Sequence, residues 1–132
     1  MATRLELQPD LAEVARLNVW LDSLCSKAGL DDAISGDMKL CLNEAVANVI
    51  AYGDITSGRI TCDLVVDATR AKAVLSDPGV PFNPLAAAVQ SPMDGLDTAQ
   101  IGGFGIKLIR ETASEIDYLR QDGRNILTLI CA

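Results

Sequence analysis

The segment LCLNEAVANVIAYGDITSGRITCDLVV, residues 40–66, contains two hydrophobic periods, and the change between them decides the fold. Before residue 52 the apolar side chains recur every three or four positions, which is the period of an amphipathic helix. From residue 60 onward apolar and polar side chains alternate, which is the period of a half-buried strand. The inward positions of that strand are Ile60, Cys62, Leu64 and Val66. Helices and strands separated in this way favour an α+β two-layer sandwich, with helices on one side of a sheet.

Further helices and strands are predicted on both sides of this segment. The central helix runs from about residue 34 to residue 51, and an earlier helix starts at Asp10, where Asp10 and Glu13 resemble a capping box, and ends at Gly29. A short strand is predicted at residues 3–8. Residues 71–77 complete a β-hairpin with residues 60–66, and residues 115–132 form two strands around an Asp-Gly turn.

The composition excludes several classes of protein. A formal net charge of −7 is a poor match for the phosphates of DNA or RNA, so no direct nucleic-acid partner is expected. No apolar run reaches the roughly 18 residues of a membrane span, and the N-terminus lacks the features of a signal peptide. We therefore expect no membrane partner and a cytoplasmic location. At 132 residues the chain fits a single domain, residues 1–132.

Histidine is absent from the whole chain. Its absence excludes Ser-His-Asp and Cys-His catalysis, histidine-ligated zinc, and a phospho-accepting histidine in this chain. The cysteines are Cys25, Cys41, Cys62 and Cys131. They form no CxxC pair, and buried, reduced thiols are favoured over a metal site or disulfides. Chemistry in this chain is therefore left to carboxylates, amides and backbone groups, with or without a bound metal.

Two polar pairs mark candidate binding positions. Glu44 and Asn48 lie four residues apart on the predicted helix, so they share a face beside the apolar stripe. They could act as a general base and an oxygen ligand for Mg²⁺, or belong to a solvated face on which Asn48 bonds to nearby backbone. Asp77 ends the strand 71–77, and Gly79 follows it. This carboxylate could accept a hydrogen bond from an exocyclic amine while the glycine admits a flat ring, or both could form an ordinary turn.

A long segment without periodicity precedes a glycine-rich turn. Residues 80–100 hold at most one turn of helix, and loops of this length are usually lids, binding loops or disordered insertions; we favour a lid. The sequence IGGFGI, residues 101–106, then places Gly102, Gly103 and Gly105 ahead of a helix. Free N–H groups and the positive end of the helix dipole suit phosphate oxygens there. The glycines could equally provide only a flexible entry into the helix.

In chain order these features are Glu-x-x-x-Asn on a helix, Asp-x-Gly at a strand end, a long loop, and Gly-Gly-x-Gly at a helix start. In this order and spacing, over nearly the whole chain, the sequence resembles the GHKL ATPase superfamily, with its N box, G1 box and G2 box around an ATP lid. More narrowly, it resembles the bacterial anti-sigma factor serine/threonine kinases. The resemblance implies the GHKL ATP-binding fold, whose mixed, mostly antiparallel sheet carries helices on one face.

The resemblance also implies a role for each motif residue. Glu44 is implied to be the catalytic base, Asn48 the Mg²⁺ ligand, and Asp77 the residue that binds the adenine amino group, with Gly79 beside it. The cofactor-binding positions implied around the phosphates of ATP are Gly102, Gly103, Phe104 and Gly105. The implied cofactors are therefore ATP and Mg²⁺.

The implied reaction is transfer of the γ-phosphoryl group of ATP to a serine or threonine of a STAS-domain antagonist, by a kinase that otherwise holds a sigma factor. Relatives often dimerise, so a homodimer is a further candidate state. Two alternatives stay open: a binding module of the same fold that uses nucleotide only as a switch or lacks transfer activity, and a small α+β interaction domain without nucleotide. Tyr52 and Ser114 stand where many relatives carry histidine and aspartate, which leaves the subfamily and its partners open.

Overall fold

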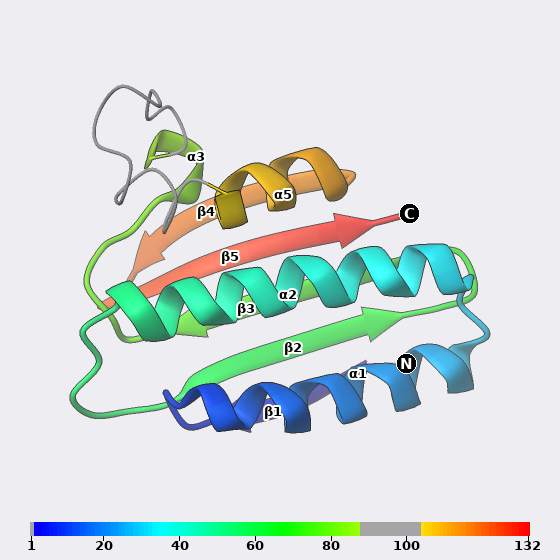
Figure 1. Cartoon of the computed structure of the whole chain (residues 1–132), viewed down its shortest axis with the longest axis horizontal. Coiled ribbons are helices and arrows are strands. Elements are labelled where there is room, and N and C mark those ends of the chain that lie inside the picture. Colours follow the sequence, from blue (N-terminus) through cyan, green and yellow to red (C-terminus); the bar gives the residue numbers. More distant parts are fainter. Residues whose placement is uncertain (1, 88–103) are drawn as a thin grey trace.

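The computed structural model describes residues 2–87 and 104–132 of the chain. In chain order its helices and strands are β1 (Ala2–Leu7), a short 3-10 helix η1 (Leu11–Glu13), α1 (Val14–Ala28), α2 (Asp32–Tyr52), β2 (Ile60–Val66), β3 (Ala71–Asp77), α3 (Pro84–Ala87), α5 (Phe104–Thr112), β4 (Glu115–Gln121) and β5 (Arg124–Cys131) (Figure 1). Within the described ranges, none of the helices combines the length and the apolar character needed to cross a bilayer.

The strands form one five-stranded sheet in the order β1-β2-β3-β5-β4. Both predicted hairpins are confirmed. In the β2–β3 turn, Asp67 Oδ1 accepts hydrogen bonds from the N–H groups of Thr69 and Arg70 at 2.8 and 3.0 Å. The β4–β5 turn has Asp122 and Gly123 at φ values of 53° and 75°, the left-handed pair that suits a two-residue hairpin turn.

The four strand pairings are antiparallel, whereas we expected a mixed, mostly antiparallel sheet. The reason is the position of β5, which lies between β3 and β4. These two strands run in the same direction, and they would pair in parallel only if they were neighbours. The expected parallel pairing is therefore absent from the described strands.

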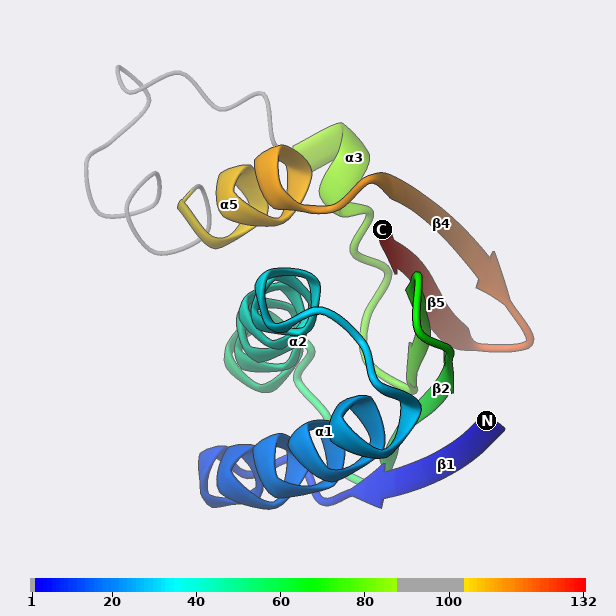
Figure 2. The ribbon, with the colours of Figure 1, turned by 90° about the vertical axis from the view of Figure 1, so that its right-hand side faces the viewer.

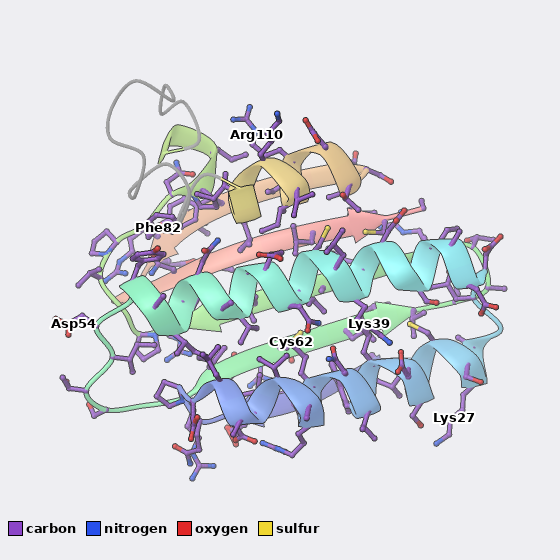
Figure 3. All side chains as sticks on the ribbon, viewed as in Figure 1. Lys27, Lys39, Asp54, Cys62, Phe82 and Arg110 are labelled. Carbon is purple, nitrogen blue, oxygen red and sulfur yellow. The ribbon has the colours of Figure 1, made fainter. Side chains whose placement is uncertain are left out.

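The helices of the described residues cover one face of the sheet, which confirms the predicted α+β two-layer sandwich (Figure 2). Alternation along β2 and β3 turns every second side chain into the space between the layers. Cys62 of β2, labelled in Figure 3, is one of these buried side chains. In the helical layer α2 lies between α1 and α5 (Figure 1). Helix α2 therefore borders α1, α5 and the centre of the sheet.

Local capping interactions determine where the two long helices begin and end. The side chain of Asp10 caps the turn before α1, and Glu13 Oε1 accepts a hydrogen bond from the N–H of Gln8 at 2.9 Å. Gly29 ends α1, as predicted, with a left-handed φ of 71°. Helix α2 begins slightly earlier than we predicted because the side chain of Asp31 caps its N-terminus.

All four cysteines are buried and free, as predicted. Burial raises the pKa of the Cys62 thiol to about 12, so this side chain remains a protonated, apolar part of the core. Cys41 of α2 and Cys131 of β5 interact through a thiol hydrogen bond, which raises the pKa of Cys41 and lowers that of Cys131. These thiols therefore contribute to the contact between α2 and the sheet.

Candidate functional site

A pocket lies where β3 ends, β5 begins and α2 reaches its C-terminus. Its lining consists of Ala45, Asn48, Val49, Tyr52, Gly53, Leu75, Asp77, Val80, Phe82, Pro84, Ile109, Tyr118, Asn125 and Leu127. Figure 3 shows Phe82 at the end of the molecule where α2 ends. Most of the lining is apolar, yet it includes the three buried polar side chains of the described residues, Asn48, Asp77 and Asn125. Buried polar groups are concentrated at this one place, as expected of a binding site.

Asp77 is the last residue of β3, and the alternation of that strand turns its side chain toward the helices, like those of Ala73 and Leu75. Only 3% of Asp77 is exposed. Its Oδ1 accepts hydrogen bonds from the N–H of Gly79 at 2.8 Å and from Nδ2 of Asn125 at 3.1 Å. A buried carboxylate needs such donors. Both donors that the described residues supply reach the same oxygen, so Oδ2 is the oxygen left for an amino group of a ligand.

Gly79 lies where two backbone segments meet. A Cβ atom at this position would stand 2.7 Å from the carbonyl oxygen of Gly53 and 2.8 Å from Asp77 Oδ1. The N–H of Val80 donates to the same Gly53 carbonyl at 2.9 Å, which connects the turn after β3 to the end of α2. Close approach of backbone therefore explains the glycine at position 79. Sequence reasoning missed Gly53, although its position directly after the predicted helix was the signal available.

Glu44 and Asn48 lie one turn apart on α2 and both face the first turn of α5. A Cβ atom at Gly105 would stand 2.9 Å from Glu44 Oε2 and 3.4 Å from Asn48 Nδ2. Asn48 is 9% exposed, so it does not belong to a solvated helix face, and Glu44 is half-buried. The absence of a side chain at Gly105 thus brings the positive end of the α5 dipole against a carboxylate and an amide. Residues from two of the sequence motifs meet at this point.

Two further polar residues near Asp77 were not singled out in the sequence. Asn125 occupies the first inward position of β5, ahead of Leu127 and Leu129 at a spacing of two. A polar side chain at an inward strand position was a usable signal for Asn125. Arg120 of β4 donates from Nη1 to the carbonyl oxygen of Gly79 at 2.7 Å. Arg120 is exposed on β4, and no pattern in the sequence marked it as part of the site.

Part of the predicted site lies outside the described residues. Gly102 and Gly103 belong to residues 88–103, and Phe104 begins α5 without a description of its side chain. Of the predicted lid, residues 80–100, the described part extends to residue 87. That part contains α3, the single helical turn that we predicted there.

A nucleotide requires space for its base, and a metal ion requires oxygen donors. The pocket encloses about 30 Å³, which is room for about two water molecules. An adenine ring needs more space than this, so nucleotide binding requires a wider pocket. No group of three or more metal-binding side chains occurs within the described ranges. Glu44 and Asn48 supply oxygen donors that suit Mg²⁺, whose remaining ligands are commonly water and nucleotide phosphates. This donor set fits a cation that arrives with a nucleotide.

The sequence of the chain matches a known protein family, in agreement with the arrangement of these residues. Residues 7–131 match the histidine kinase-like ATPase domain, and the match spans nearly the full length of the sequence. The chain therefore belongs to the histidine kinase-like ATPase domain family. Membership confirms the predicted superfamily, and ATP is the nucleotide that an ATPase domain implies.

Two curated relatives extend the comparison. The serine/threonine-protein kinase BtrW of Bordetella bronchiseptica is 29% identical over 112 residues, which cover 83% of this chain and 79% of that protein. The serine-protein kinase RsbW of Listeria monocytogenes is 25% identical over 131 residues, which cover 94% of this chain and 82% of that protein. Both names agree with the predicted resemblance to kinases within this superfamily.

A solved structure supports the fold. The crystal structure of the RsbU and RsbW domains of a Mycobacterium tuberculosis protein superimposes with a TM-score of 0.72 at 16% sequence identity. The match covers 99% of this chain, and this chain spans 32% of the length of that one. At this identity the similarity establishes the architecture, in agreement with the predicted fold class.

Proposed function

We propose that this protein is an ATP-dependent protein serine/threonine kinase of the anti-sigma factor type. Its substrate is a serine or threonine of a STAS-domain antagonist, and its other partner is a sigma factor. Family membership and the two kinase relatives support this proposal. The observation that carries it is the contact at Gly105, where the start of α5 lies against Glu44 and Asn48. In this proposal Glu44 is the base and Asn48 the metal ligand, beside a helix N-terminus that suits phosphate.

Each residue of the site has a distinct task in this mechanism. Asp77 Oδ2 accepts a hydrogen bond from the adenine amino group, and Gly79 lies beside Asp77 and donates its N–H to Oδ1. Asn48 binds Mg²⁺ through its amide oxygen. When bound, ATP with Mg²⁺ supplies the phosphoryl group and neutralises part of its charge. Glu44 accepts the proton of the attacking hydroxyl as that oxygen bonds to phosphorus and ADP leaves.

The glycines ahead of α5 complete the proposed site. Gly102, Gly103 and Gly105, with the backbone of Phe104, line the phosphates, and residues 80–100 cover the nucleotide. The proposal also includes residues 1–132 as one functional domain, a cytoplasmic location, a homodimeric state and no direct contact with nucleic acid. The net charge of −7 supports the last of these.

Phosphotransfer to a purified STAS-domain protein from the same host tests this function. We expect Mg-ATP to label that protein on serine or threonine, as located by mass spectrometry. We also expect Mg-ATP to raise the free energy of unfolding by about 2.7 kcal/mol at a hundredfold excess over its Kd. Glu44→Gln keeps the shape of the side chain and removes the base, so it should bind ATP and lose transfer.

Two further variants make the test specific. Asp77→Asn keeps an acceptor for Gly79 and Asn125 but turns an N–H toward the adenine amino group, so stabilisation by Mg-ATP should disappear. Glu111→Gln is a matched control, because Glu111 is exposed on α5 and its nearest basic partner, Lys107, is 3.9 Å away. Full transfer by Glu44→Gln, or unchanged stabilisation in Asp77→Asn, contradicts the assigned roles. Stabilisation by ATP without any phosphorylation favours the switch module over the kinase.

A further inference from the structure

Asn125 is a buried amide to which the proposed phosphotransfer chemistry assigns no task. It stands opposite Asp77 in the register between β3 and β5, and it is 6% exposed. The other two buried polar residues of the described ranges, Asn48 and Asp77, already have roles in the proposed site. Burial of an amide destabilises a protein unless its groups are hydrogen-bonded. The partners of Asn125 therefore indicate what it does.

Each hydrogen-bonding position of the Asn125 amide has a partner. Its Nδ2 donates to Asp77 Oδ1 at 3.1 Å and to the carbonyl oxygen of Val80 at 2.8 Å. Its Oδ1 accepts from the N–H of Phe82 at 3.1 Å and from the hydroxyl of Tyr118. The backbone partners determine the orientation of the amide, because a carbonyl only accepts and an N–H only donates. With both donors and both lone pairs in use, the amide retains no group for a ligand.

These bonds act on the two parts of the pocket that would contact an adenine. Asn125 and the N–H of Gly79 both donate to Asp77 Oδ1, so the carboxylate cannot rotate without breaking a hydrogen bond. Oδ2, which accepts no hydrogen bond from the described residues, is thereby held in one orientation. The bonds to residues 80 and 82 hold the backbone at the start of the predicted lid against the pocket wall.

We infer that Asn125 is a positioning residue for adenine recognition. It contacts no part of the nucleotide, and it holds Asp77 so that Oδ2 meets the 6-amino group of the base. This inference rests on the proposed function, because it takes ATP as the ligand at Asp77. The inference predicts selectivity between purine nucleotides. A purine without the 6-amino group cannot donate a hydrogen bond to Asp77 Oδ2, so the orientation of this carboxylate does not strengthen its binding.

Calorimetric titration of the full chain with two nucleotides tests the inference. The nucleotides are Mg-ATP and the Mg complex of purine ribonucleoside triphosphate, which lacks the 6-amino group. We expect wild type to bind ATP about 10- to 100-fold more tightly, as for a hydrogen bond to a charged group. In Asn125→Ala we expect this ratio to fall below about threefold, while the Kd of the deaminated nucleotide changes less than about threefold.

Asn18→Ala is the matched control. Asn18 of α1 exchanges hydrogen bonds with Asn43 of α2 at 3.2 and 2.6 Å and does not line the pocket. It removes a part-buried amide of the same size, and we expect the ratio of the two affinities to stay at its wild-type value. If the loss of a part-buried asparagine amide changed the affinity ratio only through a general structural effect, Asn18→Ala and Asn125→Ala would change it alike.

A second measurement needs no nucleotide. The N–H of Phe82 bonds to Asn125, so its hydrogen exchange in the free protein should become at least about tenfold faster in Asn125→Ala. Asn18→Ala should leave that rate unchanged. Unchanged exchange in a folded Asn125→Ala protein overturns the positioning of the backbone.

Other outcomes separate this inference from the proposed function. A wild-type affinity ratio in folded Asn125→Ala, or no preference for ATP in wild type, overturns the inference. If Asn125→Ala does not fold, Tyr118→Phe decides: it removes one donor to the amide and keeps the ring, and the ratio should fall about two- to fivefold. A wild-type ratio there overturns the inference as well. Failure of wild type to bind either nucleotide overturns the proposed function instead, and Phe82 exchange still reports the positioning.

Discussion

Substitution of Gly79 by alanine should separate two backbone segments that the fold holds in contact. The new Cβ atom would lie 2.7 Å from the carbonyl oxygen of Gly53, whereas ordinary contact begins at 3.4 Å. The segments must therefore move apart by about 0.7 Å. The hydrogen bond from Val80 N–H to the same carbonyl, now 2.9 Å, would stretch to roughly 3.6 Å, beyond hydrogen-bond range.

The expected loss of stability follows from these changes. One hydrogen bond contributes about 1 kcal/mol and local overpacking costs about 1–3 kcal/mol, while alanine stabilises by about 0.5–1 kcal/mol through the unfolded chain. The net destabilisation should be about 1–3.5 kcal/mol, which a domain with a stability of about 5–15 kcal/mol survives folded. Stabilisation by Mg-ATP should also disappear, because Asp77 Oδ1 lies 2.8 Å from the same added atom.

Urea denaturation followed by circular dichroism measures this loss, with Gly36→Ala as the control. Gly36 is exposed inside α2, and an added Cβ atom there meets nothing within 4 Å. Gly36→Ala should therefore raise stability by about 0.5–1 kcal/mol. If Gly79→Ala unfolds at the same urea concentration as wild type, or at a higher one, the argument from close backbone approach is wrong.

Two further predictions concern Gly105 and Cys62. In Gly105→Ala the added Cβ atom lies 2.9 Å from the flexible end of Glu44 and 3.4 Å from Asn48 Nδ2, which is ordinary contact. Stability should therefore change by less than about 0.5 kcal/mol, while phosphotransfer falls on the order of tenfold because the base is displaced. Denaturation and single-turnover labelling check this, and unchanged transfer would contradict it. The pKa of Cys62 is raised from 9.0 to about 12 in the folded chain. Its contribution to the free energy of unfolding is therefore full below pH 9 and is lost as pH rises toward 12. Between pH 8 and 10.5 the free energy of unfolding should fall by about 2 kcal/mol through this thiol. The urea midpoint of wild type should therefore fall more steeply with pH than that of Cys62→Ala. An equal pH dependence of the two midpoints would refute this prediction.

The candidate site could be predicted in part, because its motifs are local. Glu44 and Asn48 share a helix face through the period of α2, and Asp77 faces inward through the alternation of β3. Both orientations follow from the sequence pattern alone. The contact of Gly105 with α2 could not be predicted in the same way, because it depends on how α5 packs beside α2.

Asn125 shows the same limit more sharply. Its inward orientation could be predicted from the alternation of β5, but its partners could not. They are Asp77, Val80, Phe82 and Tyr118, which come from other strands and from the start of a long loop. Their meeting depends on the pairing of β3 with β5, which no local pattern specifies.

By itself, the sequence determined the helices, the strands, the hairpins and the superfamily. Each of these depends on residues close together in the chain: hydrophobic period, caps, turn residues and short motifs at fixed spacing. Only the tertiary structure decided that β5 lies between β3 and β4, that Gly53 meets Gly79, and that Gly105 meets Glu44. These are contacts between distant segments, and they depend on how the layers pack, which hydrophobic patterning leaves open.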